Sequence, residues 1–278
     1  MELLGLTAVM SVYHGDSPIF FKHAIDSVLN QSCKAQEFII VVDGPVGDEI
    51  NKILESVSKL SNLRIIRMSK NKGLAVSRKL AISEASTELV AVMDSDDICA
   101  ENRFELQLEE FSNPKTQVIG GWIEEFNRSP GDQCIIRKTP LTLNEIYGFG
   151  KWRNPMNHVT LMFKKSAYEA VGGYSELKYT EDWELISRML VGGVNVRNIP
   201  QVLVYVRGGD EMIIRRRKLS QIFGEIRVLW LMYKMKYLGH FHLLANIAIR
   251  ITIRIFPKKF TDYLYTNVLR KDRKKILK

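Results

Sequence analysis

The sequence predicts an α/β fold in which helices cover both faces of a mostly parallel sheet. Short apolar segments, each long enough for one buried strand, alternate with segments in which apolar residues recur at helical spacing. Several of the apolar segments end directly in polar turns, as strands do where an open α/β sheet binds its ligand. A third observation is that a strongly basic helical region follows the predicted sheet.

The first half of the predicted sheet contains four strands and three helices. We expect strands at residues 6–12, 38–42, 63–68 and 89–93, where apolar residues run together. A helix should begin at Pro18 after the N-cap Ser17, because proline is favoured at the first helical position. Helical spacing predicts a second helix at residues 50–60 and a third at residues 73–85. This alternation implies parallel strands joined by helical crossovers.

The pattern becomes less regular after Asp97. We expect an amphipathic helix at residues 101–111, strands at residues 118–125 and 158–163, and a turn at residues 172–174. A further helix should begin near Thr180, and strands at residues 194–199 and 202–206 should follow it. The prediction is therefore one α/β domain over residues 1–207 and a helical extension over residues 208–278.

Basic residues are concentrated in this C-terminal extension. The chain has 278 residues and a formal net charge of +9, yet residues 1–204 hold 22 Lys and Arg against 26 Asp and Glu. Residues 205–278 hold 18 basic residues against 5 acidic ones. Such asymmetry suggests contact with nucleic acid or with an anionic membrane surface.

The extension should contain two helices. Apolar residues from Leu219 to Tyr233 form a stripe at helical spacing, and nearly every residue from 241 to 256 is apolar. Within the second helix, polar residues recur every fourth position as one narrow stripe: His242, Asn246, Arg250 and Arg254. Two arginines in so short a segment argue against a membrane span and favour a helix lying in the membrane interface. Packing of this helix on the α/β domain is the alternative, and the two can coexist.

The remaining composition is typical of a globular protein in a reducing compartment. Hydrophobic residues make up 46% and charged residues 26% of the chain, which is ordinary for a globular domain. The three cysteines, Cys33, Cys99 and Cys134, form neither a disulfide framework nor a metal-ligand pattern. The first residues, Met1-Glu2-Leu3, lack the basic segment of a signal peptide. We therefore expect a cytosolic protein.

Three carboxylates directly follow the apolar strand at residues 89–93. They belong to Asp94, Asp96 and Asp97, and their mutual repulsion is costly unless a cation is present. Mg²⁺ and Mn²⁺ take oxygen ligands and are commonly shared with substrate phosphates. The cluster therefore predicts a metal–diphosphate site. A simpler interpretation is that Asp96 or Asp97 is the N-cap of the following helix.

Polar turns after the first, second and fourth predicted strands should lie side by side at one edge of the sheet. They are residues 13–16, Asp43-Gly44 and residues 94–96. Asp43 presents a carboxylate that could accept a hydrogen bond from a base, although an aspartate before a glycine is also an ordinary turn residue. Asn71 and Gly73 open the third helix, where a glycine lets backbone approach a ligand and the helix start favours anions.

In their order and spacing, these motifs resemble those of the family 2 glycosyltransferases. The matching segments are Met10-Ser11-Val12-Tyr13, SVLNQS from Ser27, Val42-Asp43-Gly44, NKGLAVSRKLAI from Asn71, AVMDSDD from Ala91, GGY from Gly172 and EDWEL from Glu181. The resemblance covers roughly residues 4–207. It implies the GT-A fold, a Rossmann-like sheet, and a hexosyl- or N-acetylhexosaminyltransferase. It also implies a nucleotide-sugar donor, inversion, and Mg²⁺ or Mn²⁺ as cofactor. The most similar enzymes build bacterial capsule, exopolysaccharide or O-antigen repeat units.

The resemblance also assigns a donor site. Asp43 matches a position that contacts uracil, which favours a UDP-sugar. Within the Asp-X-Asp motif, Asp94 matches the ribose-binding position, and Asp96 the ligand of a metal that bridges the diphosphate. Asp97 is then expected to cap the next helix. The other expected donor-site residues are Ser11, Val12, Tyr13, Asn71, Gly73, Arg78 and Ser95. Two residues depart from the family's pattern, which more often has Asp at Val42 and Asn at Lys79.

Inversion requires an acceptor hydroxyl to attack the anomeric carbon from the face opposite the diphosphate, where a carboxylate can take its proton. Asp182 matches the family's Glu-Asp motif and is the expected general base. Its neighbour Glu181 is the less favoured base, because successive helical residues point about 100° apart and only one can face the site. The candidates for acceptor binding are Glu181, His158 and Trp183, the last as a sugar-stacking wall. The simpler interpretations are an acid-rich helix start, a structural histidine and a core tryptophan.

Two other functions are compatible with parts of the sequence. A metal-dependent nucleotidyl or phosphoryl transferase also pairs carboxylates around Mg²⁺, but the sequence has no Gly-rich Walker loop. A nucleic-acid-binding protein would explain the basic extension, but that extension is rich in Ile and Leu and has no nucleic-acid motif.

The expected partners are therefore a UDP-sugar donor, a saccharide acceptor linked to polyprenyl diphosphate, and an anionic membrane surface, with no nucleic acid. The resemblance places such an enzyme at the cytoplasmic face of the bacterial inner membrane. The basic clusters at residues 215–218 and 270–275 would attract it there, each charge contributing about 1 kcal/mol at best.

Overall fold

One sheet of nine strands organises the molecule, which the computed structural model describes over residues 5–175, 177, 180–208 and 219–255. The strand order is β3-β2-β1-β4-β8-β6-β9-β5, and β7 pairs with β6. The strands β1 to β4 are parallel, whereas β8 runs antiparallel to both β4 and β6. The strands are β1 (Leu6–Val12), β2 (Glu37–Val42), β3 (Leu63–Arg67), β4 (Leu89–Met93), β5 (Ile98–Cys99), β6 (Val118–Phe126), β7 (Ile135–Arg137), β8 (Met162–Lys164) and β9 (Val196–Arg207).

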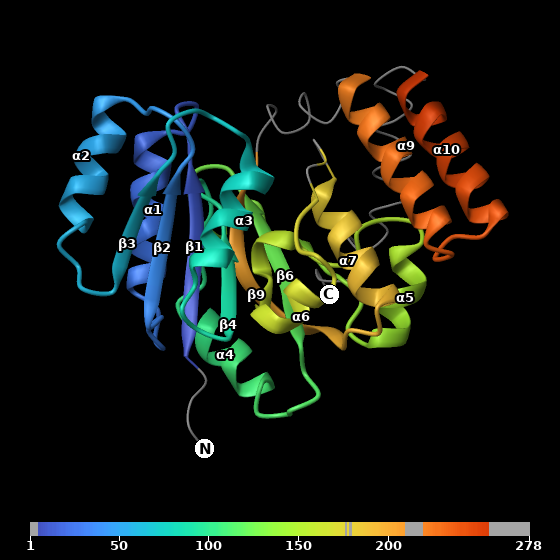
Figure 1. Ribbon diagram of the computed structural model, residues 1–278, viewed down its shortest axis with the longest axis horizontal. Coiled ribbons are helices and arrows are strands. Elements are labelled where there is room, and N and C mark those ends of the chain that lie inside the picture. The colour runs from blue at the N-terminus through green and yellow to red at the C-terminus, as the bar shows by residue number, and fades with distance from the viewer. Residues whose placement is uncertain (1–4, 176, 178–179, 209–218, 256–278) are drawn as a thin grey trace.

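Helices cover both faces of this sheet, which confirms the predicted α/β fold (Figure 1). The helices are α1 (Pro18–Leu29), α2 (Asp48–Val57), α3 (Leu74–Glu84), α4 (Arg103–Glu110), α5 (Leu143–Gly150), η1 (His158–Thr160), α6 (Lys165–Ala170), α7 (Glu181–Val191), α9 (Leu219–Lys234) and α10 (His240–Ile255). One core lies beneath α1, α2 and α4, and a second lies beneath α3, α6 and α7. Strands buried on both faces explain why β1, β2 and β4 are continuous apolar segments.

The second half of the sheet differs from the prediction in two places. Residues 158–163 are not one strand, because His158–Thr160 forms a 3₁₀ turn and β8 begins only at Met162. The two strands expected at residues 194–206 are a single strand, β9, whose register against β6 shifts beside Gly121 and Trp122. Pro200 lies within β9 and cannot donate a ladder hydrogen bond. It interrupts the apolar pattern of the sequence, although the strand continues through it.

The helices α9 and α10 pack on the α/β domain beside α5 and α7 (Figure 1). Val228, Leu229 and Met232 of α9 belong to the same core cluster as Trp183 of α7. The hydroxyl of Tyr237, which is buried in the turn between α9 and α10, donates to the carbonyl oxygen of Tyr147 at 2.7 Å. These two helices therefore pack on the α/β domain, which is the alternative that the sequence left open.

The polar stripe of α10 faces the domain. Asn246 is 1% exposed, and its amide donates to the carbonyl oxygen of Lys151 at 3.0 Å. Arg250 donates to the carbonyl oxygen of Trp152 and pairs with Glu225 of α9, each at 3.1 Å. The outward face of the two helices exposes large apolar side chains, Phe223, Trp230, Phe241, Leu244, Ile249 and Ile251, beside exposed basic residues such as Arg227 and Lys234.

None of the helices in the described part of the chain has both the length and the apolar character needed to cross a membrane. The basic clusters at residues 215–218 and 270–275 lie outside the described residues, as does the side chain of Arg254.

Candidate active site

Asp43 is held rigidly at the end of β2. Its carboxylate accepts hydrogen bonds from the backbone N–H groups of Lys72 at 2.7 Å and Gly73 at 2.9 Å. The preceding segment reinforces this contact, because the amide of Asn71 donates to the carbonyl oxygen of Asp43 at 3.2 Å. Gly44 has a φ of 86°, and a Cβ there would lie 2.5 Å from the backbone nitrogen of Asn71. Only glycine allows the two loops to approach this closely.

The start of α3 leaves open space beside Asp43. Gly73 has a φ of 93°, and a Cβ built on it would meet no atom within 4 Å. Asn71 is exposed, so its side chain borders the same space. The Gly73 N–H group, which was expected to favour an anion, instead donates to Asp43. The position of Gly73 therefore borders open space, whereas the adjoining Asp43 is only 2% exposed and both of its carboxylate oxygens accept backbone hydrogen bonds.

Only one of the three expected donor-site residues in β1 and its turn exposes its side chain. Ser11 is buried, and its hydroxyl donates to the hydroxyl of Ser77 on α3 at 2.7 Å. The Val12 side chain is fully buried, and its carbonyl oxygen accepts from the Asp43 N–H at 2.8 Å. Tyr13 is 40% exposed. Ser11 and Val12 therefore support the site through the core, and Tyr13 borders it.

The carboxylates of Asp94, Asp96 and Asp97 come together directly after β4. An oxygen atom from each lies within 4.8 Å of the others, which makes this the one group in the described parts of the chain with metal-ligand spacing. Asp94 and Asp96 are partly exposed, whereas Asp97 is buried. Burial and then the negative charges of Asp96 and Asp94 raise the pKa of Asp97 well above its ordinary value. A bound cation would offset this repulsion, so the donor set fits a hard divalent metal.

The expectation that Asp97 caps a helix is wrong. The short strand β5 follows it, and α4 begins only at Arg103. Asp97 instead accepts a hydrogen bond from the backbone N–H of Arg207 at 2.9 Å, at the end of β9. This contact joins residues far apart in the chain, so the local pattern could not indicate it.

Asp16 is a fourth carboxylate at this edge, and the sequence analysis did not select it. It accepts hydrogen bonds from the Ser95 hydroxyl at 2.8 Å and from the Tyr13 N–H at 3.1 Å. Burial, together with the charge of Asp94, raises its pKa against the effect of these hydrogen bonds. Its place in the polar turn after β1 was the only sequence signal. The Ser95 hydroxyl is thus engaged with Asp16.

Arg78 connects the two sides of the site. Its buried guanidinium, on α3, forms an ion pair with Asp94 at the end of β4 and lies 3.9 Å from the carboxylate of Glu181 on α7. Burial disfavours the charged guanidinium, but Asp94, Tyr174 and Glu181 together raise the pKa of Arg78 above its ordinary value. Arg78 is therefore a buried, permanently charged link and not a surface arginine.

Glu181 and Asp182 point to different partners from the first turn of α7. Glu181 faces Arg78, and its pKa is raised by burial and by the charge of Asp182, against the effect of Arg78. Asp182 is partly exposed, and its Oδ2 accepts a hydrogen bond from the amide of Asn154 at 2.8 Å. The divergence expected from helical geometry is thus present. The sequence analysis did not predict that Asn154 contacts Asp182.

His158 is held by Tyr174 rather than by a metal-ligand group. Its Nε2 lies 2.5 Å from the hydroxyl of Tyr174, whose pKa is raised by burial. Burial and the charge of Arg78 lower the pKa of His158 well below its ordinary value, so the ring is neutral at pH 7. The GGY turn places Tyr174, because Gly172 and Gly173 have φ of 83° and 65° and the Tyr174 N–H donates to the Tyr168 hydroxyl at 2.9 Å.

Trp183 cannot form a wall for an acceptor sugar. It is 4% exposed, and its Nε1 donates to the carbonyl oxygen of Gly150 at 2.9 Å. The guanidinium of Arg250 covers its ring at 5.0 Å from the ring centroid. This corrects the expectation from the sequence, since Trp183 is a core residue on which α10 packs.

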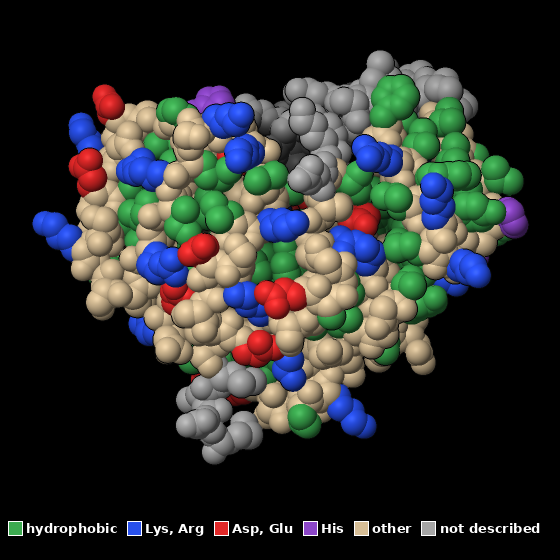
Figure 2. All heavy atoms as spheres, viewed as in Figure 1, with side chains coloured by type: hydrophobic (Ala, Val, Ile, Leu, Met, Phe, Trp, Pro, Cys, Tyr) green, Lys and Arg blue, Asp and Glu red, His purple; other side chains and the backbone are tan. Residues whose placement is uncertain are grey.

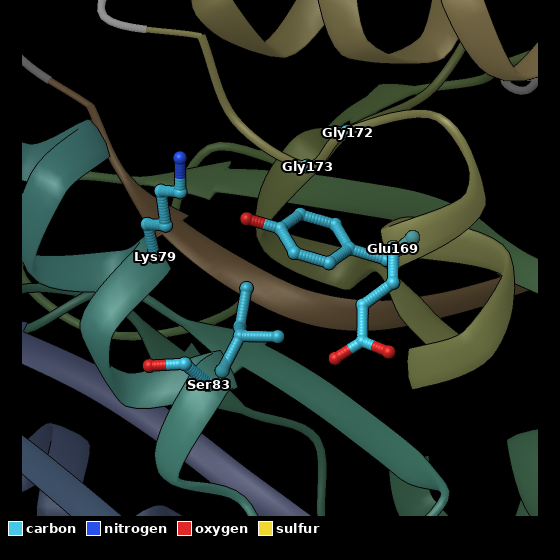
Figure 3. A pocket seen from close by; sticks show the side chains of 7 residues that line it. Lys79, Ser83, Glu169, Gly172 and Gly173 are labelled. Atoms are coloured by element: carbon cyan, nitrogen blue, oxygen red, sulfur yellow. The ribbon is translucent and has the colours of Figure 1, made fainter.

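A separate hollow of about 240 Å³ lies between α3 and α6. Figure 3 shows Lys79 and Ser83 on one side of it, and Glu169 with Gly172 and Gly173 on the other. Ile82 and Tyr168 also line it, and none of the predicted donor or acceptor residues does. Lys79, which replaces the family's Asn, therefore lines this hollow and not the acidic edge of the sheet.

Comparisons with known proteins agree with this arrangement. Residues 7–170 match the family model "Glycosyl transferase family 2". The Escherichia coli UDP-Gal:alpha-D-GlcNAc-diphosphoundecaprenol beta-1,3-galactosyltransferase is 34% identical over 266 residues, which cover 95% of this chain and 96% of that protein. The amylovoran biosynthesis glycosyltransferase AmsE of Erwinia amylovora is 30% identical over 269 residues, 96% of this chain and 99% of that protein.

Solved structures share the fold at low sequence identity. TarS of S. aureus, residues 1–349 in complex with UDP-GlcNAc, superposes with a TM-score of 0.67 at 17% identity, over 95% of this chain and 76% of that one. Against a longer TarS chain, the match spans 46% of its length. Family match, relatives along nearly the full length and the sheet with its acidic edge agree: the chain belongs to glycosyl transferase family 2 and is a glycosyltransferase with the GT-A fold.

Proposed function

We propose that this protein transfers a sugar from a UDP-sugar, with inversion, to a saccharide linked to polyprenyl diphosphate, in bacterial surface polysaccharide synthesis. The observation that carries the proposal is the position of Arg78. One buried guanidinium contacts Asp94 of the acidic edge and lies 3.9 Å from Glu181, whose neighbour Asp182 is the candidate base. This link supports a single site that contains the donor groups and the candidate base.

The donor side supports a nucleoside diphosphate. Asp43 adjoins the open space at Gly73, the N-cap of α3, and is itself 2% exposed. A carboxylate oxygen can accept more than one hydrogen bond, so Asp43 could accept a further one from uracil. Two of the relatives are described by UDP-linked ligands, UDP-Gal for the E. coli enzyme and UDP-GlcNAc for the TarS complex. Tyr13, Asn71 and Asp94 would complete the nucleoside site.

The acidic edge would hold Mg²⁺ or Mn²⁺, with Asp96 as the principal ligand and Asp94 and Asp97 beside it. A bound divalent ion neutralises negative charge that develops on the leaving diphosphate. The protein's own contribution is to hold three carboxylates close together against their repulsion, with Asp97 anchored by the Arg207 N–H.

Asp182 would act as the general base. The acceptor hydroxyl loses its proton to the carboxylate as its oxygen bonds to the anomeric carbon, while the bond from that carbon to the diphosphate oxygen breaks. This single displacement inverts the anomeric configuration. Glu181 is less favoured on geometry, because its carboxylate is directed at the buried guanidinium of Arg78, 3.9 Å away.

A donor screen tests this function. UDP-, GDP- and TDP-sugars are compared for binding, each with and without Mn²⁺, and we expect UDP-sugars to bind in a metal-dependent way. Equal binding of all three classes, or binding indifferent to Mn²⁺, would contradict the donor assignment. Release of pyrophosphate from a nucleoside triphosphate and a sugar phosphate would indicate a nucleotidyltransferase instead.

We also propose that the protein attaches to the cytoplasmic face of the inner membrane, where a polyprenyl-linked acceptor would be presented. The support is the outward apolar face of α9 and α10, on which Phe223 and Phe241 are 74% and 73% exposed. Figure 2 shows hydrophobic side chains gathered over these helices. The exposed basic residues Arg227, Lys234 and Lys236 accompany this face and suit an anionic surface.

Sedimentation of the full chain with liposomes tests this attachment. We expect binding to anionic vesicles that weakens with salt, and loss of binding in Phe241→Glu/Leu244→Glu. The control is Leu60→Glu, which changes a residue 40% exposed between α2 and β3 and should bind as the wild type does. Arg215→Glu/Arg216→Glu/Arg217→Glu should also bind less, with activity on a soluble acceptor intact. Binding that ignores both salt and lipid charge would contradict the proposal.

A further inference from the structure

Asn154 directly contacts the candidate base. Its Nδ2 donates to the Oδ2 of Asp182 at 2.8 Å, across 28 residues of sequence. Asn154 lies in the segment between α5 and η1, whereas Asp182 lies in the first turn of α7. Both side chains are partly buried. The contact therefore joins the acceptor side of the site to a segment that no family motif quoted above includes.

The surroundings fix which way the Asn154 amide points. Its Oδ1 accepts a hydrogen bond from the backbone N–H of Met156 at 3.2 Å, and a backbone N–H can only donate. The amide nitrogen must therefore face Asp182. Pro155 restricts Asn154 to extended backbone, and both Pro155 and Met156 are buried. The carbonyl oxygen of Pro155 also accepts from the amide of Asn198 at 3.2 Å, which anchors the segment to β9.

A neutral donor on one oxygen suits a carboxylate that must take up a proton. It holds the carboxylate plane while Oδ1 stays available, and it adds no positive charge that would make the group a weak base. Glu181, the adjacent carboxylate, has a guanidinium partner instead. We propose that Asn154 is the positioning residue that holds Asp182 with Oδ1 directed to the acceptor hydroxyl, an inference that rests on the proposed role of Asp182 as base.

Two substitutions in the full-length protein test this role. Asn154→Ala removes the donor, and Asn154→Asp keeps the shape of the side chain while replacing the donor with a second carboxylate. We expect kcat to fall by up to about 10²-fold in both variants, because a displaced base loses its reactive geometry. Donor KM should stay unchanged. The expected signature is therefore a loss of kcat that is not accompanied by a change in donor KM.

A matched control is Asn157→Ala, in the same segment, whose amide donates to the carbonyl oxygen of Gly121 at 2.8 Å. It tests whether a weakened segment alone lowers kcat. We expect kcat to stay close to that of the wild type in this control, and a loss equal to that of Asn154→Ala would overturn the inference.

Asp182→Asn, measured in parallel, separates the two proposals. If Asp182→Asn loses turnover while both Asn154 variants keep the wild-type kcat, the positioning role is wrong and the base assignment stands. If Asp182→Asn keeps its turnover, the proposed base is wrong. Thermal unfolding of each variant shows whether it is folded, and the donor KM shows whether its donor site is intact.

Discussion

Two carboxylates on the donor side are held differently from those on the acceptor side. On the donor side, Asp43 is held by the backbone N–H groups of Lys72 and Gly73, and Asp97 by that of Arg207, whereas Asp94 pairs with the Arg78 side chain. On the acceptor side, Asp182 is held by a side-chain amide and Glu181 faces a side-chain guanidinium. A backbone N–H donor remains after almost any substitution of its own residue, whereas a side-chain donor is removed by a single substitution. The placement of Asp43 and Asp97 should therefore tolerate changes in neighbouring residues that the placement of Asp94, Glu181 and Asp182 does not.

The largest effect should come from the donor side's own carboxylates. We expect Asp96→Asn to abolish transfer and metal-dependent donor binding, because one ligand charge is lost beside the diphosphate. Donor affinity is measured with and without Mn²⁺, and turnover is measured across Mn²⁺ concentrations. Near-normal turnover of this variant at low Mn²⁺ would rule out the assignment of Asp96.

On the acceptor side, the corresponding change from aspartate to asparagine should lower the turnover rate without lowering the affinity for the donor. Asp182→Asn should retain UDP-sugar binding but lower kcat by about 10²–10⁴-fold, the usual cost of removing a general base. Titration calorimetry and initial rates give the two quantities. A loss of donor affinity as large as the loss of rate would place Asp182 in the donor site and weaken the contrast.

The GGY turn tests how strongly the acceptor side depends on side-chain packing. Gly173→Ala puts a Cβ 2.6 Å from the Tyr168 ring at a φ of 65°, and we expect roughly 3 kcal/mol loss in the free energy of unfolding. Gly193→Ala is the control, with a φ of 75° and no atom within 4 Å, and should lose about 1–2 kcal/mol. Urea unfolding measures both, and equal losses would mean that Tyr168 is free to move.

Glu37 is held by both kinds of donor and predicts a pH dependence. Burial alone would raise its pKa, but hydrogen bonds from the Ser86 N–H, Arg64, and the Ser86 and Thr7 hydroxyls hold the pKa below its ordinary value. Its stabilising effect is therefore complete above the unfolded-state pKa and is lost as pH falls through the folded-state value. Glu37→Gln should lower the free energy of unfolding at pH 7 by about 1–2 kcal/mol.

That difference between wild type and Glu37→Gln should shrink as the solution is acidified. Urea unfolding at neutral and acidic pH measures it. If the difference in the free energy of unfolding between wild type and Glu37→Gln stays constant with pH, the charge of Glu37 does not account for its stabilising effect. Hydrogen bonds that the protonated Glu37 also makes would then account for it.

The smallest effect should come from Lys72→Ala. The backbone N–H that holds Asp43 remains, so we expect donor affinity within about threefold of the wild type, no more than the lower part of the roughly 0.5–1.5 kcal/mol of one hydrogen bond. Isothermal titration with UDP measures it. A tenfold loss would show that the Lys72 side chain itself binds the donor.

The position of the carboxylates at the edge of the sheet was largely predictable because they follow strands that the local pattern identifies. Asp43, Asp94 and Asp96 come directly after apolar segments, and adjacent parallel strands bring such ends together. Asp97 was misassigned because its partner, Arg207, lies 110 residues later. The contacts of Asn154 with Asp182 and of Tyr174 with His158 also join separate segments, and no local pattern indicates them.

Periodicity showed which residues of α10 share a face, but it could not show which way that face turns. Asn246 faces inward because its amide donates to the carbonyl oxygen of Lys151. Arg250 faces inward because it donates to the carbonyl oxygen of Trp152 and pairs with Glu225. Trp183 was open to two interpretations for the same reason, since its partners Gly150 and Arg250 lie in other segments.

The inward polar stripe of α10 limits how the protein can be divided for engineering. A fragment ending at Arg207 would leave the Trp183 ring uncovered and the carbonyl oxygens of Tyr147 and Lys151 without their hydrogen-bond donors. Fusing residues 1–207 to the membrane anchor of another protein would therefore expose part of the hydrophobic core. A chimera that keeps α9 and α10 and exchanges only their outward-facing residues would preserve this packing. What can be exchanged is therefore the outward surface of the two helices and not the whole C-terminal segment.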